Sequence, residues 1–157
     1  MAFIQYETHA GVQRFVRELN HIYRRETALW EIDNRWDGFD WIDADNSVQG
    51  ILSFVRKAKD GSAILCILNF RPESHESFRL GVPFAGGWQE ILSSDDVRFG
   101  GSGKTNPRRM HTKKVPSHGR EQSLVLTVPP LGGTLIKLTH PSNTHTGETS
   151  HARKRRI

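Results

Sequence analysis

The chain has 157 residues, of which 36% are hydrophobic and 25% charged, and its formal net charge at pH 7 is +5. This length suits one domain of about 100–150 residues with extensions. No apolar run approaches the roughly 20 residues of a membrane-spanning helix, and residues 1–9 lack the basic and apolar blocks of a secretion signal. The sequence therefore predicts a cytoplasmic protein with no membrane partner.

The positive charge is concentrated near the C-terminus, where residues 153–156 are all basic and Glu148 is the one acid after Thr139. Elsewhere lysines and arginines are interspersed with acids, unlike the concentrated stripe of a protein that follows a phosphate backbone. We therefore expect no nucleic-acid partner. The alternative is a basic adaptor that binds nucleic acid through residues 153–156.

An amphipathic helix is predicted over residues 9–25, because apolar residues recur there at steps of three and four with polar residues between them. The apolar residues are Val12, Phe15, Val16, Leu19, Ile22 and Tyr23. Full burial of such side chains stabilises by roughly 1.5–3 kcal/mol each. The stripe therefore needs cover, and one possibility is this chain's own sheet.

Residues 26–46 lose this periodicity and combine aromatic side chains with acids, so we predict a loop. The aromatic residues are Trp30, Trp36, Phe39 and Trp41, and the acids are Glu31, Asp33, Asp37, Asp40, Asp43 and Asp45. Indole rings stack on the flat apolar faces of sugars, and carboxylates bind sugar hydroxyls, so the composition suits a glucan site. The alternative is that the rings seal the joint between the helix and a sheet.

Two apolar runs that flank a turn at Gly61 predict an antiparallel hairpin over residues 47–70. The second run is uninterrupted from residue 63 to residue 68, which predicts a strand covered on both faces. Cys66 lies in that run and is the only cysteine, so we expect a buried thiol and no internal disulfide.

Short alternating or apolar runs with Gly and Pro between them continue to residue 138 and indicate an all-β antiparallel sandwich. Strands are predicted at residues 77–82, 88–92, 123–128 and 134–138, with an edge strand at 113–115 and an exposed loop at 95–111. Residues 139–157 are predicted to be a disordered basic tail, because their composition cannot form a core.

No motif for catalysis, metal or nucleotide is complete. Residues 99–105 resemble a phosphate-binding loop, but Arg98 stands where that motif needs Gly, and Asn106-Pro107 excludes the helix that follows it. The histidines have no metal-ligand spacing, and acids on a loop are not a fixed catalytic pair. We therefore predict neither a cofactor nor a metal.

Several segments taken together resemble the C-terminal part of the 1,4-alpha-glucan (glycogen) branching enzymes of the alpha-amylase superfamily. The resemblance runs colinearly from about residue 3 to residue 138. Its most characteristic segments are Gly11-Val-Gln-Arg-Phe-Val-Arg-Glu-Leu-Asn20, Gly38-Phe-Asp-Trp-Ile-Asp43, Phe78-Arg-Leu-Gly-Val-Pro83, Gly87-Trp-Gln-Glu-Ile-Leu92, Gly100-Gly-Ser-Gly103, Ser117-His-Gly-Arg120 and Ser123-Leu-Val-Leu-Thr-Val-Pro-Pro-Leu131.

This resemblance implies an anatomy. Residues 1–30 would be a remnant of a catalytic (β/α)8 barrel that carries its last helix, residues 31–46 an aromatic and acidic connector, and residues 47–138 the C-terminal β-sandwich. The catalytic carboxylates of the family lie in barrel segments upstream of these residues. The chain thus resembles a fragment that is inactive alone, and its helix should fold back, self-associate or be poorly ordered without a barrel in cis or in trans.

The resemblance also implies a ligand. Trp41 matches a family tryptophan suited to stacking on an α-glucan such as glycogen or amylose, and Phe39 and Trp36 lie close to it in the sequence. We take these three residues as the candidate glucan site. The alternative to a supporting domain of an enzyme is a free-standing, non-catalytic glucan-binding module.

Overall fold

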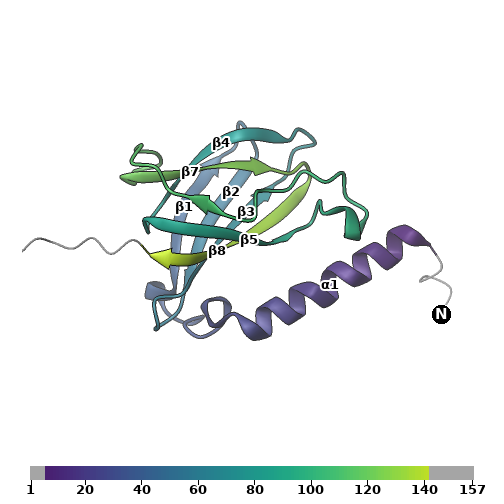
Figure 1. Ribbon diagram of the computed structural model, residues 1–157, viewed down its shortest axis with the longest axis horizontal. Coiled ribbons are helices and arrows are strands. Elements are labelled where there is room, and N and C mark those ends of the chain that lie inside the picture. Colours follow the sequence, from purple (N-terminus) through teal and green to yellow (C-terminus); the bar gives the residue numbers. More distant parts are fainter. Residues whose placement is uncertain (1–5, 142–157) are drawn as a thin grey trace, which may run out of the picture.

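The computed structural model describes residues 6–141. In this part of the chain, helix α1 (Glu7–Arg25) precedes two antiparallel sheets, one with the strand order β1-β2-β3-β8-β5-β6 and one that pairs β4 with β7 (Figure 1). The strands are Phe39–Asn46 (β1), Ile51–Lys57 (β2), Ala63–Asn69 (β3), His75–Val82 (β4), Gly86–Ser93 (β5), Met110–His111 (β6), Gln122–Val128 (β7) and Gly132–Pro141 (β8). The predicted all-β sandwich after one helix is confirmed.

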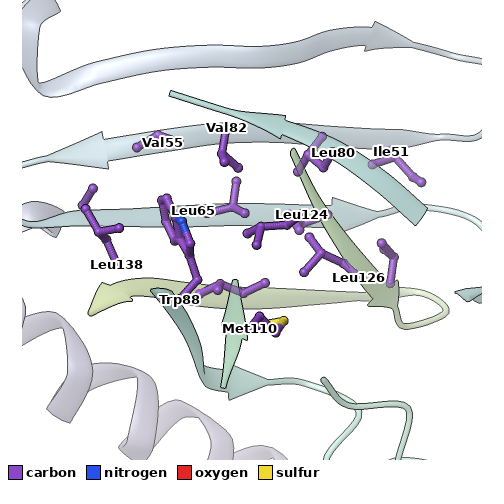
Figure 2. Packing of buried hydrophobic residues seen from close by; sticks show 14 residues of the cluster. Ile51, Val55, Leu65, Leu80, Val82, Trp88, Met110, Leu124, Leu126 and Leu138 are labelled. Carbon is purple, nitrogen blue, oxygen red and sulfur yellow. The ribbon is translucent and has the colours of Figure 1, made fainter. Parts of the chain in front are cut away.

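The main core fills the space between the two sheets. Figure 2 shows Val55 and Leu65 from the large sheet facing Leu80, Val82 and the β7 residues of the small sheet. Trp88 on β5 closes one side of this core and is almost fully buried. The alternation of apolar residues along β2, β4 and β7 places one set of side chains inward, as expected for strands with one covered face.

A second, smaller cluster covers the outer face of the large sheet. Ile64 and Cys66 of β3 point to this face and pack with Ala28, which lies in a 3₁₀ turn (Thr27–Leu29) directly after α1. The prediction that residues 63–68 form a strand covered on both faces is therefore confirmed. Desolvation raises the pKa of the Cys66 thiol to about 12, so the group stays protonated and unreactive.

The predicted loop over residues 26–46 is wrong for its last part, because Phe39–Asn46 forms strand β1 and pairs with β2 at the edge of the large sheet. A turn at residues 47–50, which we had assigned to the following strand, joins the two, and the Gly50 amide donates to the Asn46 carbonyl over 2.8 Å. The sheet therefore begins at Phe39 rather than at residue 47.

Two further expectations are corrected in the large sheet, one at its edge strand β6 and one at the interior strand β8. The short edge strand is Met110–His111, whereas Lys113 makes only an isolated bridge to Ser123. Residue 139, expected in the disordered tail, instead lies within β8, which runs to Pro141 and pairs there with Gly86. The rest of the predicted tail, with the basic residues 153–156, lies outside the described residues.

Helix α1 is attached to the sandwich along one side only (Figure 1). Gly11 approaches the loop after β5 so closely that a Cβ there would lie 2.2 Å from the Phe99 carbonyl oxygen, and the Phe15 ring meets the Phe99 ring edge to face at 5.4 Å. Near its C-terminus Ile22 is fully buried. The helix is thus ordered and folded back on this chain, one of the three expected outcomes.

Most of the predicted apolar stripe nevertheless stays exposed, because it lies about a quarter turn away from the attached side. We call these residues the exposed stripe: Val12, Val16, Leu19 and Tyr23. They follow the spacing i, i+4, i+7 and i+11, which aligns them on one face of a helix.

Within residues 6–141 no helix is both long and apolar enough to span a bilayer.

Candidate functional site

Three aromatic rings form a cluster on the outer face of the large sheet, at its β1 edge. Phe39 and Trp41 lie two residues apart on β1 and so share one face, and Trp41 is in register with Phe54 on β2. The Phe39 ring stacks on the Phe54 ring at 5.1 Å, and the Trp41 ring meets both edge to face at 4.8 and 5.7 Å. Such contacts hold the Trp41 indole in a fixed orientation.

Trp36 completes the site from a 3₁₀ turn (Trp36–Gly38) directly before β1. This turn requires glycine at its end, because a Cβ on Gly38 would lie 2.1 Å from the Ile32 carbonyl oxygen. The Trp36 side chain is 90% exposed, and Trp41 is 47% exposed. The two rings therefore face solvent and do not seal the joint between helix and sheet, where the buried Ala28 and Ile32 lie instead.

The aromatic rings border a surface hollow of about 480 Å³. We call it the aromatic hollow, and it is lined by Asp33, Asn34, Arg35, Trp36, Phe39, Trp41 and Arg56. All three residues predicted for the glucan site are thus brought together in one place. Trp30, the other tryptophan of the same stretch, lies apart and lines a different hollow with Tyr23 and Arg24.

Charged groups form the rim of the aromatic hollow, and each is paired. The Arg56 guanidinium donates from Nη2 to Asp33 Oδ1 over 2.6 Å, and Arg35 donates from Nε and Nη2 to the two oxygens of Asp37 over 3.0 and 2.7 Å. The Arg56 Nε–H is buried and has no hydrogen-bond acceptor among the described residues. The rim therefore offers fixed donors and acceptors beside the aromatic faces.

Arg56 joins the site from the neighbouring strand and was not predicted as a site residue. Its signal was the phase of β2: Phe54 and Arg56 are two residues apart, so both point to the outer face, while Val55 points to the core. The residue ends the first apolar run of the predicted hairpin, where it was not considered as a binding residue.

Several of the acids in residues 33–45 engage basic partners. Asp33 and Asp37 are bound by Arg56 and Arg35, and Asp40 accepts a hydrogen bond of 2.8 Å from Arg120. Among residues 6–141, no three His, Cys, Asp or Glu side chains come together as metal ligands. The carboxylates nearest the aromatic rings are thus held in ion pairs.

The glycine-rich loop that resembled a phosphate-binding motif binds a carboxylate of its own chain. Asp95 accepts hydrogen bonds from the Ser102 amide, the Ser102 hydroxyl and the Lys104 amide over 3.0, 2.7 and 2.8 Å. Desolvation raises the pKa of Asp95, but these hydrogen bonds outweigh it and leave the pKa below its ordinary value. The loop thus closes on Asp95, and its Phe99 contacts Phe15 of helix α1.

Comparison with known proteins identifies the family. Residues 41–139 match the family described as "Alpha amylase, C-terminal all-beta domain". The 1,4-alpha-glucan branching enzyme GlgB of Desulfitobacterium hafniense is 46% identical over 135 residues, which are 85% of this chain and 21% of that enzyme. The enzyme of the same name from Aromatoleum aromaticum is 48% identical over 123 residues, 78% of this chain and 19% of that enzyme.

A third relative, the 1,4-alpha-glucan branching enzyme GlgB of Methylobacillus flagellatus, is 44% identical over 129 residues, 82% of this chain and 18% of the enzyme. The chain thus spans about a fifth of the length of the curated relatives it matches. These matches confirm the resemblance drawn from the sequence. The chain belongs to the family of alpha-amylase C-terminal all-β domains and is homologous to that part of the 1,4-alpha-glucan branching enzymes.

Proposed function

We propose that this chain is the C-terminal β-domain of a 1,4-alpha-glucan branching enzyme, acting in the cytoplasm in glycogen synthesis. In that role it supports a catalytic barrel and contributes a contact for the α-glucan chain, while the catalytic carboxylates belong to the barrel. The observation that carries this proposal is the aromatic hollow, combined with homology to branching enzymes over most of the chain.

The aromatic hollow has the parts that a glucan chain needs. Trp41 is held by its ring contacts and is half exposed, so one surface is open for stacking on a glucose ring. Trp36 projects from the adjacent turn and offers a second aromatic surface at the same hollow. The ion pair of Arg56 with Asp33 provides donors and acceptors for hydroxyl groups at the rim.

The exposed stripe supports the second half of the proposal, contact with a barrel. Four apolar side chains in line on one face of an ordered helix are what a helix presents when it packs on a neighbouring element. The near side of the same helix is already attached to the sandwich through Gly11 and Ile22. Helix α1 is thus shaped to bridge two bodies, with the sandwich on one side and the barrel on the other.

The glucan contact is tested by affinity electrophoresis of the full chain through gels that contain glycogen. Replacing Trp41 by Ala removes the stacking surface and should weaken the apparent affinity for glycogen about five- to 160-fold, since a stacked ring is worth roughly 1–3 kcal/mol. Trp30→Ala is the matched control, because Trp30 is also exposed but lies outside the aromatic hollow. Equal mobility of the wild-type and Trp41→Ala chains at every glycogen concentration would refute the contact.

A branching assay separates the supporting domain from a free-standing module. The purified chain should introduce no α-1,6 linkages into amylose, and adding a polypeptide that carries the barrel should be necessary for branching. Glycogen affinity of this chain, together with undiminished branching when these residues are deleted from a continuous polypeptide that carries the barrel, would favour the free-standing module.

A further inference from the structure

A turn at residues 117–120 contacts strand β1, which carries Trp41. Ser117 and Arg120 close this turn through reciprocal backbone hydrogen bonds of 3.0 and 2.9 Å, with His118 and Gly119 at its tip in left-handed conformation. The turn is seated against β4, where a Cβ on Gly81 would lie 1.9 Å from the Ser117 carbonyl oxygen. The turn is thus fixed to the small sheet before it reaches β1.

Two side chains of the turn contact β1 on either side of Trp41. Arg120 Nη2 donates to Asp40 Oδ1 over 2.8 Å and lies 3.4 Å from the Trp41 carbonyl oxygen. On the other side, His118 Nε2 lies 3.4 Å from Asp43 Oδ2. All four of these side chains are at least two-thirds buried.

The orientation of the His118 ring follows from its second nitrogen. The Gly81 amide donates to His118 Nδ1 over 3.3 Å, so Nδ1 is an acceptor and Nε2 carries the hydrogen that faces Asp43. The Ser117 hydroxyl also lies 2.8 Å from Nδ1. The ring is therefore oriented from the small sheet and directed at β1.

Strand β1 needs this support because its own pairing is weak where Trp41 lies. It is an edge strand that, within residues 6–141, pairs with β2 alone, and the register shifts between Trp41 and Asp43 and again between Asp43 and Asn46. Such bulges leave a residue unpaired and disrupt the ladder of hydrogen bonds. The contacts from Arg120 and His118 act on the residues directly beside this irregular stretch.

We propose that Arg120 and His118 are positioning residues for glucan binding, which act by holding β1 so that the Trp41 indole stays oriented toward the aromatic hollow. This inference rests on the proposed function. Neither side chain lines the hollow, so both act through Asp40 and Asp43 rather than on the glucan.

The first test measures glycogen affinity of the full chain after Arg120→Gln. The substitution removes the charge from one partly buried ion pair and should weaken affinity about three- to tenfold. In a Trp41→Ala chain the same substitution should cause no further loss, because the residue it positions is gone. Arg79→Gln is the matched control, since Arg79 bonds to Ser123 on the same small sheet without touching β1.

A second variant addresses the same ion pair from the other strand. Asp40→Asn should reproduce the loss seen with Arg120→Gln, the double variant should be no weaker than either single one, and Arg120→Lys should recover part of the affinity. Losses that add up in the double variant, or a loss of the same size in the Trp41→Ala chain, would overturn the positioning role.

A fluorescence measurement keeps this inference separate from the glucan proposal. With Trp30 and Trp36 replaced by Phe, the emission comes from Trp41 and from Trp88, which is buried and serves as an internal reference. Arg120→Gln should about double the acrylamide quenching constant of Trp41 and lower its anisotropy. If neither the wild type nor any variant binds glycogen, the proposed glucan contact is wrong, whereas the quenching still shows whether Arg120 holds Trp41 in place. Unchanged quenching would overturn this inference, whatever the affinity shows.

Discussion

Replacing Val16 by Asp tests whether the exposed stripe belongs to a neighbour rather than to this chain. The stripe residues Val12, Val16, Leu19 and Tyr23 are 62%, 47%, 36% and 49% exposed, so about half of their surface is still open. Full burial of one such side chain stabilises by roughly 1.5–3 kcal/mol, so covering the four would add about 3–6 kcal/mol.

This magnitude decides how a barrel has to be connected. Association of two separate molecules costs about 4–15 kcal/mol in lost freedom, a range that overlaps the roughly 3–6 kcal/mol of the exposed stripe and extends well above it. We therefore expect a barrel added in trans to bind weakly through the stripe alone. In one continuous polypeptide the same contact bears no such cost, and burial of the stripe is then sufficient to hold the helix against the barrel.

The assay uses urea unfolding of the isolated chain and of a longer polypeptide that includes the barrel. In the isolated chain, Val16→Asp should lower the free energy of unfolding by less than about 1 kcal/mol, because Val16 is half exposed and Asp and Val have similar helix propensities. With the barrel present the same carboxylate would be buried without a partner, and the loss should rise to about 3–5 kcal/mol.

The matched control is His21→Asp, which places the same side chain on the solvent-exposed face of α1, nearly opposite the stripe. It should leave both polypeptides within about 1 kcal/mol of the wild type. The reasoning is refuted if Val16→Asp destabilises the isolated chain by 2 kcal/mol more than this control, since the stripe would then already be covered by its own chain.

Two further predictions concern the loop that holds the helix. Gly11→Ala favours the helix by about 1 kcal/mol through helix propensity, yet the new Cβ would lie 2.2 Å from the Phe99 carbonyl oxygen. The clash should loosen the helix, so hydrogen exchange of the α1 amides should become faster. Unchanged protection of these amides would contradict the close contact. Glu90 on β5, to which Asn106 of the loop donates, and Asp95 of the loop should show opposite pH dependence. Desolvation raises the pKa of Glu90 above 4.5 although Asn106 donates to its carboxylate. The folded state therefore binds the proton more tightly than the unfolded state, and the ionised carboxylate destabilises the fold at higher pH. Glu90→Gln should stabilise the fold at pH 7, and this gain should fade toward pH 4. For Asp95, hydrogen bonds outweigh desolvation and hold the pKa below 3.8, so its contribution is present above pH 3.8 and lost as the pH falls further; Asp95→Asn should cost about 1–3 kcal/mol at pH 7. Urea unfolding between pH 3 and pH 7 measures both, and equal signs for the two variants would disprove the assignment.

The elements that the sequence predicted correctly are those whose signal is local. Strand β3 was predicted because residues 63–68 are apolar without interruption, which is the pattern of a strand with both faces covered. Helix α1 was predicted from its 3.6-residue period, although its observed N-terminus is two residues earlier than expected. These patterns need no knowledge of the neighbours of each element.

Strand β1 was missed because its sequence carries the signals of a loop. Acids occupy Asp40, Asp43 and Asp45, and the bulges after Trp41 break the period of two that would have marked a strand. The acids are accommodated because an edge strand exposes one side and because Arg120, 80 residues away in the sequence, binds Asp40. A partner at that separation leaves no trace in a local pattern.

The candidate site was predicted in part for the same reason. Trp36, Phe39 and Trp41 are close in sequence, so their joint presence in one hollow could be foreseen once they were suspected of a shared role. Arg56, which lines the hollow, comes from the neighbouring strand, and His118, which contacts β1 from outside the hollow, comes from the turn beside the small sheet. Their places depend on strand pairing and on the packing of the two sheets, which composition and spacing do not determine.

The exposed stripe and the aromatic hollow lie close together, which supports the proposed function. Trp30 lines a hollow with Tyr23 at the end of the stripe, and Asp33, three residues later, lines the aromatic hollow. Three residues span at most about 11 Å even when fully extended. A barrel that covered the stripe would therefore end close to the aromatic hollow, and a glucan stacked on Trp41 would lie at the rim of that interface. The two surfaces are explained together by a domain that holds a glucan chain beside a catalytic partner, whereas a free-standing module would have no use for the stripe.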